Sequence, residues 1–246
     1  MDNTTSIALS RLIAQQRAMS VTATNIANAA TAGYRGERMV FGDWLVRQGG
    51  ATPPGGQALV YTQDRATYRD TAPGPVSQTG NPLDFSLAEG GYFTVLTPRG
   101  PRLTRGGHYE LSAAGQIVDG QGNALLDTAG KPIQVGIADG TLAVSGDGTI
   151  TGANGQLGRI GVVRPADEQK LLAEGGLLFN AGATTTTPLA APRITQGTLE
   201  GSNIQPTMEL TRMMNDLREF QFVSQFVQGE ADRQQGAIDK ITQKNG

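Results

Sequence analysis

The sequence predicts an α+β protein in which N- and C-terminal helices pair as a coiled-coil-like stem around a central all-β domain of short strands. Apolar residues recur at alternating spacings of three and four near both ends, as in a helix with one apolar stripe. The middle is rich in glycine, with 34 glycines in 246 residues. Glycine at this density is typical of many tight turns, and hence of many short strands.

The N-terminal helix is expected near residues 5–30. Its apolar stripe, interrupted by Gln16, consists of Leu9, Leu12, Met19, Ala23 and Ile26. Asn3, Thr4 and Thr5 offer side-chain oxygens that could cap the first turn. Gly33 can adopt the left-handed conformation that often follows a helix.

The C-terminal helix is expected from Thr207 to Lys244, with Pro206 suited to its first turn. The stripe, which includes the polar Ser224 and Gln234, has these apolar members: Leu210, Met213, Leu217, Phe220, Val227, Ala231, Ile238 and Ile241. At about 1.5 Å per residue this helix would be roughly 55 Å long. That length exceeds what a compact domain of this size needs, so the two ends are expected to pair with each other and with neighbouring subunits.

The predicted organisation has four parts. Residues 1–34 form the N-terminal stem helix, 35–58 a linker or extended segment, 59–192 the β-rich domain, and 193–246 the C-terminal motif and long helix. Within them, Gly49–Gly56 is typical of a linker, 165–179 of a short helical piece and 182–192 of a loop. Two segments share a Ser-x-x-Gly-x-Ile pattern, at Ser112 and Ser145, which indicates either a repeated hairpin or coincidence in a glycine-rich chain.

Several classes of function are disfavoured. The formal net charge of −2 leaves no basic surplus for nucleic acid, and the absence of cysteine excludes thiolate metal sites. His108, the only histidine, stands in a glycine turn that enters a strand. Asp119 begins a Ca²⁺-loop-like run, but position 12 is Gly130 rather than glutamate, so a β-turn is expected. We therefore expect no enzyme activity, cofactor or metal, no membrane-spanning helix and no cleaved signal peptide.

Two terminal segments carry a family resemblance. Asn25-Ile26-Ala27-Asn28 through Gly33-Tyr34-Arg35 resembles the N-terminal signature of flagellar rod, hook and hook-associated proteins. Gly197 to Ile204, which contains Leu199, Glu200, Ser202 and Asn203, resembles the signature that precedes their C-terminal helix. The central runs Thr79–Phe85 and Gly90–Phe93 are similar to the β-domain of the same family.

The resemblance implies a structural subunit of the periplasmic basal-body rod, exported by the flagellar type III apparatus without a cleaved signal. It also implies that the subunit assembles helically with other copies of itself and with proximal and distal rod proteins. In such an assembly the end helices would line a central channel. The terminal stripes are then the expected assembly interfaces.

The sequence alone is also compatible with other functions. The chain could be a distal rather than a proximal rod subunit. From other classes of protein, it could be a β-rich carbohydrate-active or adhesive domain with scaffold helices, or an export chaperone.

Overall fold

The computed structural model describes residues 2–47, 58–88, 90–175 and 177–244. Helices stand at the two ends of the chain and a β-rich region lies between them, as the sequence predicted. The chain divides into two compact units. The stem unit comprises Met1–Ala27, Glu37–Tyr68 and Gln205–Gly246, and the β unit comprises Asn28–Gly36 and Arg69–Ile204.

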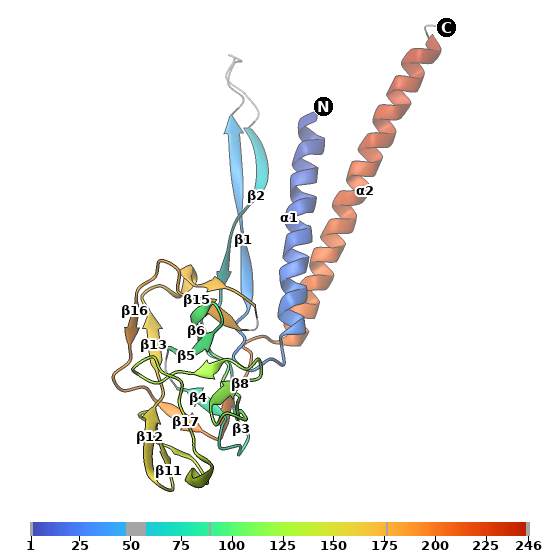
Figure 1. The fold of residues 1–246 in the computed structure, drawn as a ribbon. Helices are drawn as coiled ribbons and strands as arrows, with labels where there is room; N and C mark the ends of the chain where they lie inside the picture. The colour runs from blue at the N-terminus through green and yellow to red at the C-terminus, as the bar shows by residue number, and fades with distance from the viewer. Residues whose placement is uncertain (1, 48–57, 89, 176, 245–246) are drawn as a thin grey trace. The chain divides into compact units, whose positions relative to one another are not determined.

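The stem unit contains two helices and a two-stranded sheet. Helix α1 spans Asp2–Ala27 and helix α2 spans Pro206–Lys244, while strands β1 (Glu37–Arg47) and β2 (Ala58–Arg69) pair with each other. The helices lie side by side and run in opposite directions (Figure 1). Pro206 is the first residue of α2, as predicted, because its missing N–H would have no partner in the first turn of a helix.

Two predicted boundaries of the N-terminal helix differ from the structure. Asn3–Thr5 lie inside α1 rather than before it, so they are not its caps. The helix ends at Ala27, and the carbonyl of Asn28 accepts a hydrogen bond from the Thr31 N–H at 3.1 Å in the turn that follows. The predicted linker over 35–58 contains strand β1, while its glycine- and proline-rich part, Gly49–Gly56, lies outside the described residues.

The buried stripe of α1 is rotated relative to the predicted one. Four of its buried residues each precede a stripe position by one: Ala8, Gln15, Thr22 and Asn25. Leu12, Met19 and Ile26 are half-buried, whereas Leu9 and Ala23 are exposed. One residue corresponds to about 100° around a helix. The apolar pattern missed this rotation because the buried face includes small and polar side chains.

The predicted apolar stripe of α2 agrees in part with the buried face of this helix. Met213, Phe220 and Val227 are half-buried, whereas the remaining predicted positions with described side chains are exposed: Leu210, Leu217, Ala231 and Ile238. The residues one position before Leu210, Leu217 and Ala231 are buried or half-buried instead, namely Glu209, Asp216 and Glu230, and Val223 is buried one position before the polar Ser224. The side chain of Ile241 lies outside the described residues.

The β unit is built mainly on one sheet of nine strands. Along its main path the order is β14-β15-β6-β5-β9-β8-β7, and β13 joins β5 to β16. The strands are β5 (Tyr92–Thr97), β6 (Gly100–Thr104), β7 (Tyr109–Leu111), β8 (Ile117–Asp119), β9 (Ala124–Leu125), β13 (Val162–Pro165), β14 (Leu172–Ala173), β15 (Leu178–Asn180) and β16 (Thr186–Pro188). All of their pairings are antiparallel.

Three smaller sheets complete this unit. Strands β10 (Ala143–Val144), β11 (Thr149–Gly152) and β12 (Gly155–Arg159) form one. Strand β17 (Ile194–Gln196) pairs with β4 (Phe85–Leu87), and β18 (Thr198–Glu200) pairs with β3 (Val76–Gln78). Short 3-10 helices span Ile137–Asp139 and Glu168–Lys170. The helical piece expected over 165–179 is therefore one turn followed by β14 and β15, and the loop expected over 182–192 contains β16.

Side chains of strand β5 enter two separate apolar clusters. Phe93 and Val95 belong to the larger cluster, whereas Tyr92 belongs to a second cluster with Leu103 and Phe179. Successive side chains of a strand point to opposite faces, so the sheet is covered on both sides. The β unit thus buries its own core, as the sequence indicated.

The Ser-x-x-Gly pattern is confirmed as a recurring hairpin loop. In the Ser112 loop, the Ser112 N–H donates to the Gln116 carbonyl at 2.8 Å, and the Gly115 N–H donates to the Ser112 carbonyl at 2.9 Å. The same two bonds occur in the loops that begin at Asp119, Asp127 and Ser145. In each loop the fourth residue is a glycine with positive φ: Gly115, Gly122, Gly130 and Gly148. The Asp119 run is therefore a turn, as expected.

Among the described glycines, Gly107 leaves the least room for a Cβ atom. A Cβ atom at this position would lie 1.8 Å from the Phe85 carbonyl oxygen. The Phe85 N–H donates to the Gly107 carbonyl at 2.8 Å, which holds the two backbones together. Only glycine fits here without displacing the start of β4.

Replacing Gly107 with alanine should destabilise the protein, because the added methyl group meets backbone rather than a mobile side chain. We expect Gly107→Ala to lower the free energy of unfolding by roughly 2–4 kcal/mol, measured by urea denaturation. Gly120→Ala is the matched control, because a Cβ atom at that position would have no neighbour within 4 Å. Equal denaturation midpoints for the two variants would contradict this account.

Candidate functional site

Asn25, in the N-terminal motif, joins the last turn of α1 to the start of β1. Its Nδ2 donates to the Glu37 carbonyl at 2.9 Å, and its Oδ1 accepts from the Glu37 N–H at 3.0 Å. The side chain is only 1% exposed, and its Nδ2 also lies 3.5 Å from Glu209 Oε2. Asn25 therefore satisfies the backbone of Glu37 as a neighbouring strand would.

Glu209 is a buried acid in the first turn of α2. It is 1% exposed, and its Oε1 accepts from Arg38 Nη1 at 2.6 Å and from Arg212 Nη1 at 2.8 Å. Burying a carboxylate is costly unless charge-assisted hydrogen bonds satisfy it, so these pairs restrict the geometry strongly. Together with Asn25 and Glu37 they form a polar cluster, here called the stem clamp, which links α1, α2 and β1.

A second polar cluster lies in the β unit and contains Glu200 of the C-terminal motif. Arg105 Nη2 contacts Glu200 Oε2 at 2.8 Å, and Arg35 Nη2 lies 3.6 Å from Glu200 Oε1. Arg35 also pairs with Glu168 Oε2 at 3.2 Å. Burial lowers the pKa of the Arg105 guanidinium, although the Glu200 carboxylate opposes this shift.

Tyr92 extends this cluster. Its hydroxyl donates to Glu168 Oε2 at 3.0 Å. Burial, and secondarily the Glu168 charge, raise the pKa of Tyr92 to about 12. The hydroxyl therefore stays protonated at neutral pH and serves as a hydrogen-bond donor within the cluster.

The two motif segments also meet through their backbones. The Gly33 N–H donates to the Glu200 carbonyl at 2.7 Å, and a Cβ on Gly33 would lie 2.5 Å from the backbone of Arg105. The Gly36 N–H donates to Asn203 Oδ1 at 2.8 Å, while Asn203 Nδ2 donates to two further carbonyls of the chain. The N- and C-terminal motifs of the β unit are therefore adjacent.

The remaining motif residues occupy supporting positions. Tyr34, Asn28, Ile26 and Leu199 are half-buried, Ser202 is buried, and Ala27 is the exposed last residue of α1. The Ser202 hydroxyl accepts from the Ile204 N–H at 3.2 Å. The structure thus brings the motif residues into contacts that hold backbone segments together.

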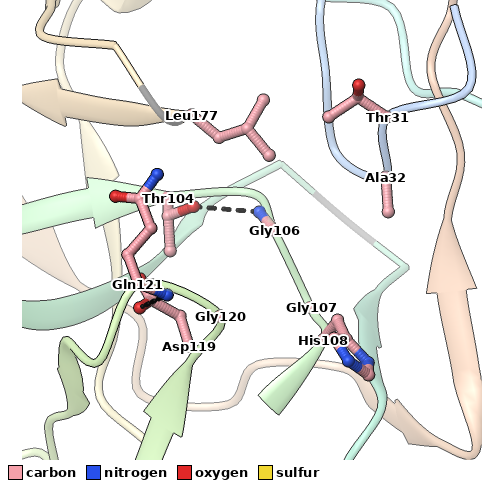
Figure 2. Close-up of a pocket in the computed structure, with 10 residues that line it drawn as sticks. All are labelled: Thr31, Ala32, Thr104, Gly106, Gly107, His108, Asp119, Gly120, Gln121 and Leu177. Carbon is pink, nitrogen blue, oxygen red and sulfur yellow. Dashed lines mark hydrogen bonds between the residues drawn. The ribbon is translucent and has the colours of Figure 1, made fainter. Parts of the chain in front are cut away.

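A small open cavity of about 260 Å³ in the β unit contains the sole histidine (Figure 2). Its lining residues are Thr31, Ala32, Thr104, Gly106, Gly107, His108, Asp119, Gly120, Gln121 and Leu177. His108 Nδ1 lies 2.7 Å from Asp84 Oδ1, and Tyr109 begins β7 directly after it, as the sequence indicated. Within the described part of the chain, no group of three or more His, Cys, Asp or Glu side chains is arranged so that it could hold a metal ion.

Both helices expose large apolar side chains. On α1 these are Leu9 and Ile13. On α2 they are Met208, Leu210, Met214, Leu217, Phe222, Phe226 and Ile238. Phe222 is 72% exposed, which is unusual for phenylalanine in a folded chain. Within the described residues, no helix combines the length and apolar character needed to span a membrane.

Most charged residues of the two clusters could not be identified from the sequence. Glu209, Arg38, Arg105 and Glu168 had no motif to mark them, and an acid in the first turn of a helix is ordinarily a surface residue. A signal was present in Arg35, which closes the N-terminal motif and pairs with the buried Glu200 and the half-buried Glu168.

Three family models match the chain. A flagella basal body rod protein model matches residues 6–35, a flagellar hook protein FlgE/F/G D1 domain model matches 88–152, and a flagellar basal body rod FlgEFG protein C-terminal model matches 195–239. The matches cover both terminal motifs and part of the β unit.

Full-length relatives agree with these models. The chain is 31% identical over 250 residues to the flagellar basal-body rod protein FlgF of Caulobacter vibrioides, with all of both chains covered. It is 28% identical over 247 residues to FlgF of Mesorhizobium japonicum, again with complete coverage. It is also 27% identical over 234 residues to the rod protein FlgG of Bacillus subtilis, covering 86% of this chain and 89% of that protein. The chain belongs to the FlgF family of flagellar basal-body rod proteins, with the FlgG proteins as close relatives.

Proposed function

We propose that this rod subunit is a non-catalytic part of the proximal rod. It polymerises helically through its terminal helices, and the polymer forms part of the drive shaft and of the export channel. The observation that carries the proposal is the set of large apolar residues exposed on α2, above all Phe222. Leu210, Met214 and Leu217 are spaced by four and three residues, so they are neighbours on the helix surface, and an exposed apolar patch marks an interaction site. Each large side chain that becomes buried contributes roughly 1.5–3 kcal/mol.

In this proposal α1 and α2 form a coiled-coil-like stem. One face of each helix is buried within the subunit, and the other face is left for neighbouring subunits. The predicted interface residues that are exposed in the single chain, among them Leu9, Leu210 and Leu217, fit the second face. Met213, Phe220 and Val227 fit the first, because they are half-buried.

The proposed partners are other copies of this chain, proximal and distal rod proteins, and the flagellar type III export apparatus. The subunit would act in the periplasmic part of the basal body after export without a cleaved signal. A place in the distal rod is the alternative that the FlgG relatives keep open. Neither the family models nor the relatives support the carbohydrate-active alternative.

The stem clamp has a mechanical role in this proposal. Asn25 and Glu209 fix the last turn of α1, the first turn of α2 and the start of β1 in one geometry. A subunit that transmits torque needs such a fixed junction. With a flexible junction, the exposed apolar faces of α1 and α2 would adopt many relative orientations.

Phe222→Asp should abolish incorporation of the subunit into purified basal bodies, because a charged side chain would replace a large apolar one in the interface. Its melting temperature should stay close to that of the unmodified protein, since the side chain is exposed in the single chain. Phe222→Leu is the matched control and should assemble and support motility. Normal incorporation of Phe222→Asp would refute assembly through this face.

Asn25→Ala should loosen the start of β1, because it removes both hydrogen bonds to Glu37 and leaves the buried backbone groups unsatisfied. We expect a loss of roughly 1–3 kcal/mol in the free energy of unfolding, and faster amide exchange at Glu37. Gln16→Ala, at an exposed position of the same helix, should change neither quantity. Unchanged exchange at Glu37 in Asn25→Ala would argue against the clamp.

A further inference from the structure

The stem unit contains a cleft of about 340 Å³ between its helices and its two-stranded sheet. Its lining residues come from α1, α2, β1 and β2: Ala18, Val21, Thr22, Asn25, Glu37, Arg38, Met39, Tyr68, Arg212, Asn215 and Asp216. The cleft is open to solvent and lies beside the stem clamp. A space of this size accepts one long side chain from outside the molecule.

Asp216 is the charged group of this cleft that has no partner. It is half-buried, and no hydrogen bond or ion pair reaches its carboxylate from any residue that the structure describes. The two arginines of the cleft, Arg38 and Arg212, are both engaged by Glu209. Burial raises the pKa of the Asp216 carboxyl, and the nearby charges of Glu219 and Glu209 raise it further. The cleft therefore has an uncompensated negative charge.

Arg218 provides the complementary charge on another side of the same helix. Two residues along a helix correspond to about 200° around its axis, so Arg218 and Asp216 lie on nearly opposite faces. Arg218 is exposed, and no described residue pairs with its guanidinium. Met214 and Phe222 stand four residues before and after it, so all three lie on one ridge.

Burying this ridge would place Arg218 in an apolar interface. A guanidinium removed from water needs a carboxylate or several acceptors to offset its desolvation. Because the ridge exposes two large apolar residues, its burial against another molecule would bring Arg218 with it. The partner surface must therefore present a carboxylate or several hydrogen-bond acceptors to Arg218.

We propose that Arg218 of one copy of this chain enters the stem cleft of a second copy and pairs with Asp216 there. Charge complementarity favours a second copy, because among the described residues Arg218 is an unpaired cation on an apolar ridge and Asp216 is an unpaired acid in a cleft. The two surfaces differ, so their contact is heterologous, and a repeated heterologous contact that does not close produces a helical filament. The inference rests on the proposed assembly through α2, and it adds the pair of residues that sets the register.

The uncompensated charge can be measured on the free protein. A carboxyl with a raised pKa in the folded state is destabilising when ionised, and this penalty grows as pH rises through its unfolded pKa. Asp216→Asn removes the penalty. We expect this variant to raise the melting temperature of the free protein at pH 7 and to leave it unchanged near pH 3. A lower melting temperature at pH 7 would show that Asp216 has a stabilising partner within its own chain, which would overturn the proposal.

The pair itself is tested by exchanging the charges in cells. Asp216→Arg and Arg218→Asp should each reduce incorporation into purified basal bodies by roughly ten-fold or more, because like charges would then meet. The double variant Asp216→Arg/Arg218→Asp should restore incorporation and motility. Thermal melts of the purified variants separate loss of the interface from loss of the fold.

Each other outcome of the exchange is also decisive. Normal incorporation of either single variant would overturn the pairing, and so would a double variant that folds but does not recover. In both cases Phe222→Asp distinguishes a failure of the Arg218–Asp216 pairing from a failure of assembly through α2. If that variant is excluded from the rod, assembly through α2 stands and Arg218 meets a group other than Asp216. If it is incorporated normally, the proposed function itself fails.

Discussion

The antiparallel contact between α1 and α2 is the constraint on which the stem unit depends. Gln15 Nε2 donates to Glu219 Oε2 at 3.1 Å near its middle, and Asn25 approaches Glu209 near its base. Isolated helices are marginal in water, so each helix is stabilised mainly by this contact. Because polar groups with fixed hydrogen-bond directions take part, the contact selects one register, whereas a purely apolar seam would tolerate several.

The composition of that contact explains the exposed apolar surface. Small and polar side chains fill much of the buried face, including Ala8, Thr22 and Glu209. Large apolar side chains such as Met214 and Phe222 therefore remain outside. A chain optimised to be stable alone would place its largest apolar residues in the seam. The opposite distribution is typical of a subunit whose greatest apolar burial comes with assembly.

The sequence predicted the element types well and the helix faces only in part. The left-handed turn at Gly33, the helix start at Pro206 and the Ser-x-x-Gly loops follow from backbone geometry that glycine and proline dictate, so local sequence suffices for them. The rotation of the α1 stripe by one residue could not be found in this way, because it depends on the burial of Gln15 and Asn25. Such residues look like surface positions until their partners, many residues away, are known.

The positions of the two family motifs follow from the same physics. The N-terminal motif crosses from the stem unit to the β unit between Ala27 and Asn28, and the C-terminal motif ends where Gln205 re-enters the stem unit. At such crossings the chain leaves regular structure, so its backbone groups need partners that no helix or sheet supplies. Gly33, Glu200 and Asn203 provide them through backbone and amide hydrogen bonds. The motif residues therefore satisfy the backbone at the two crossings, whereas the exposed faces of the helices take no part in these hydrogen bonds.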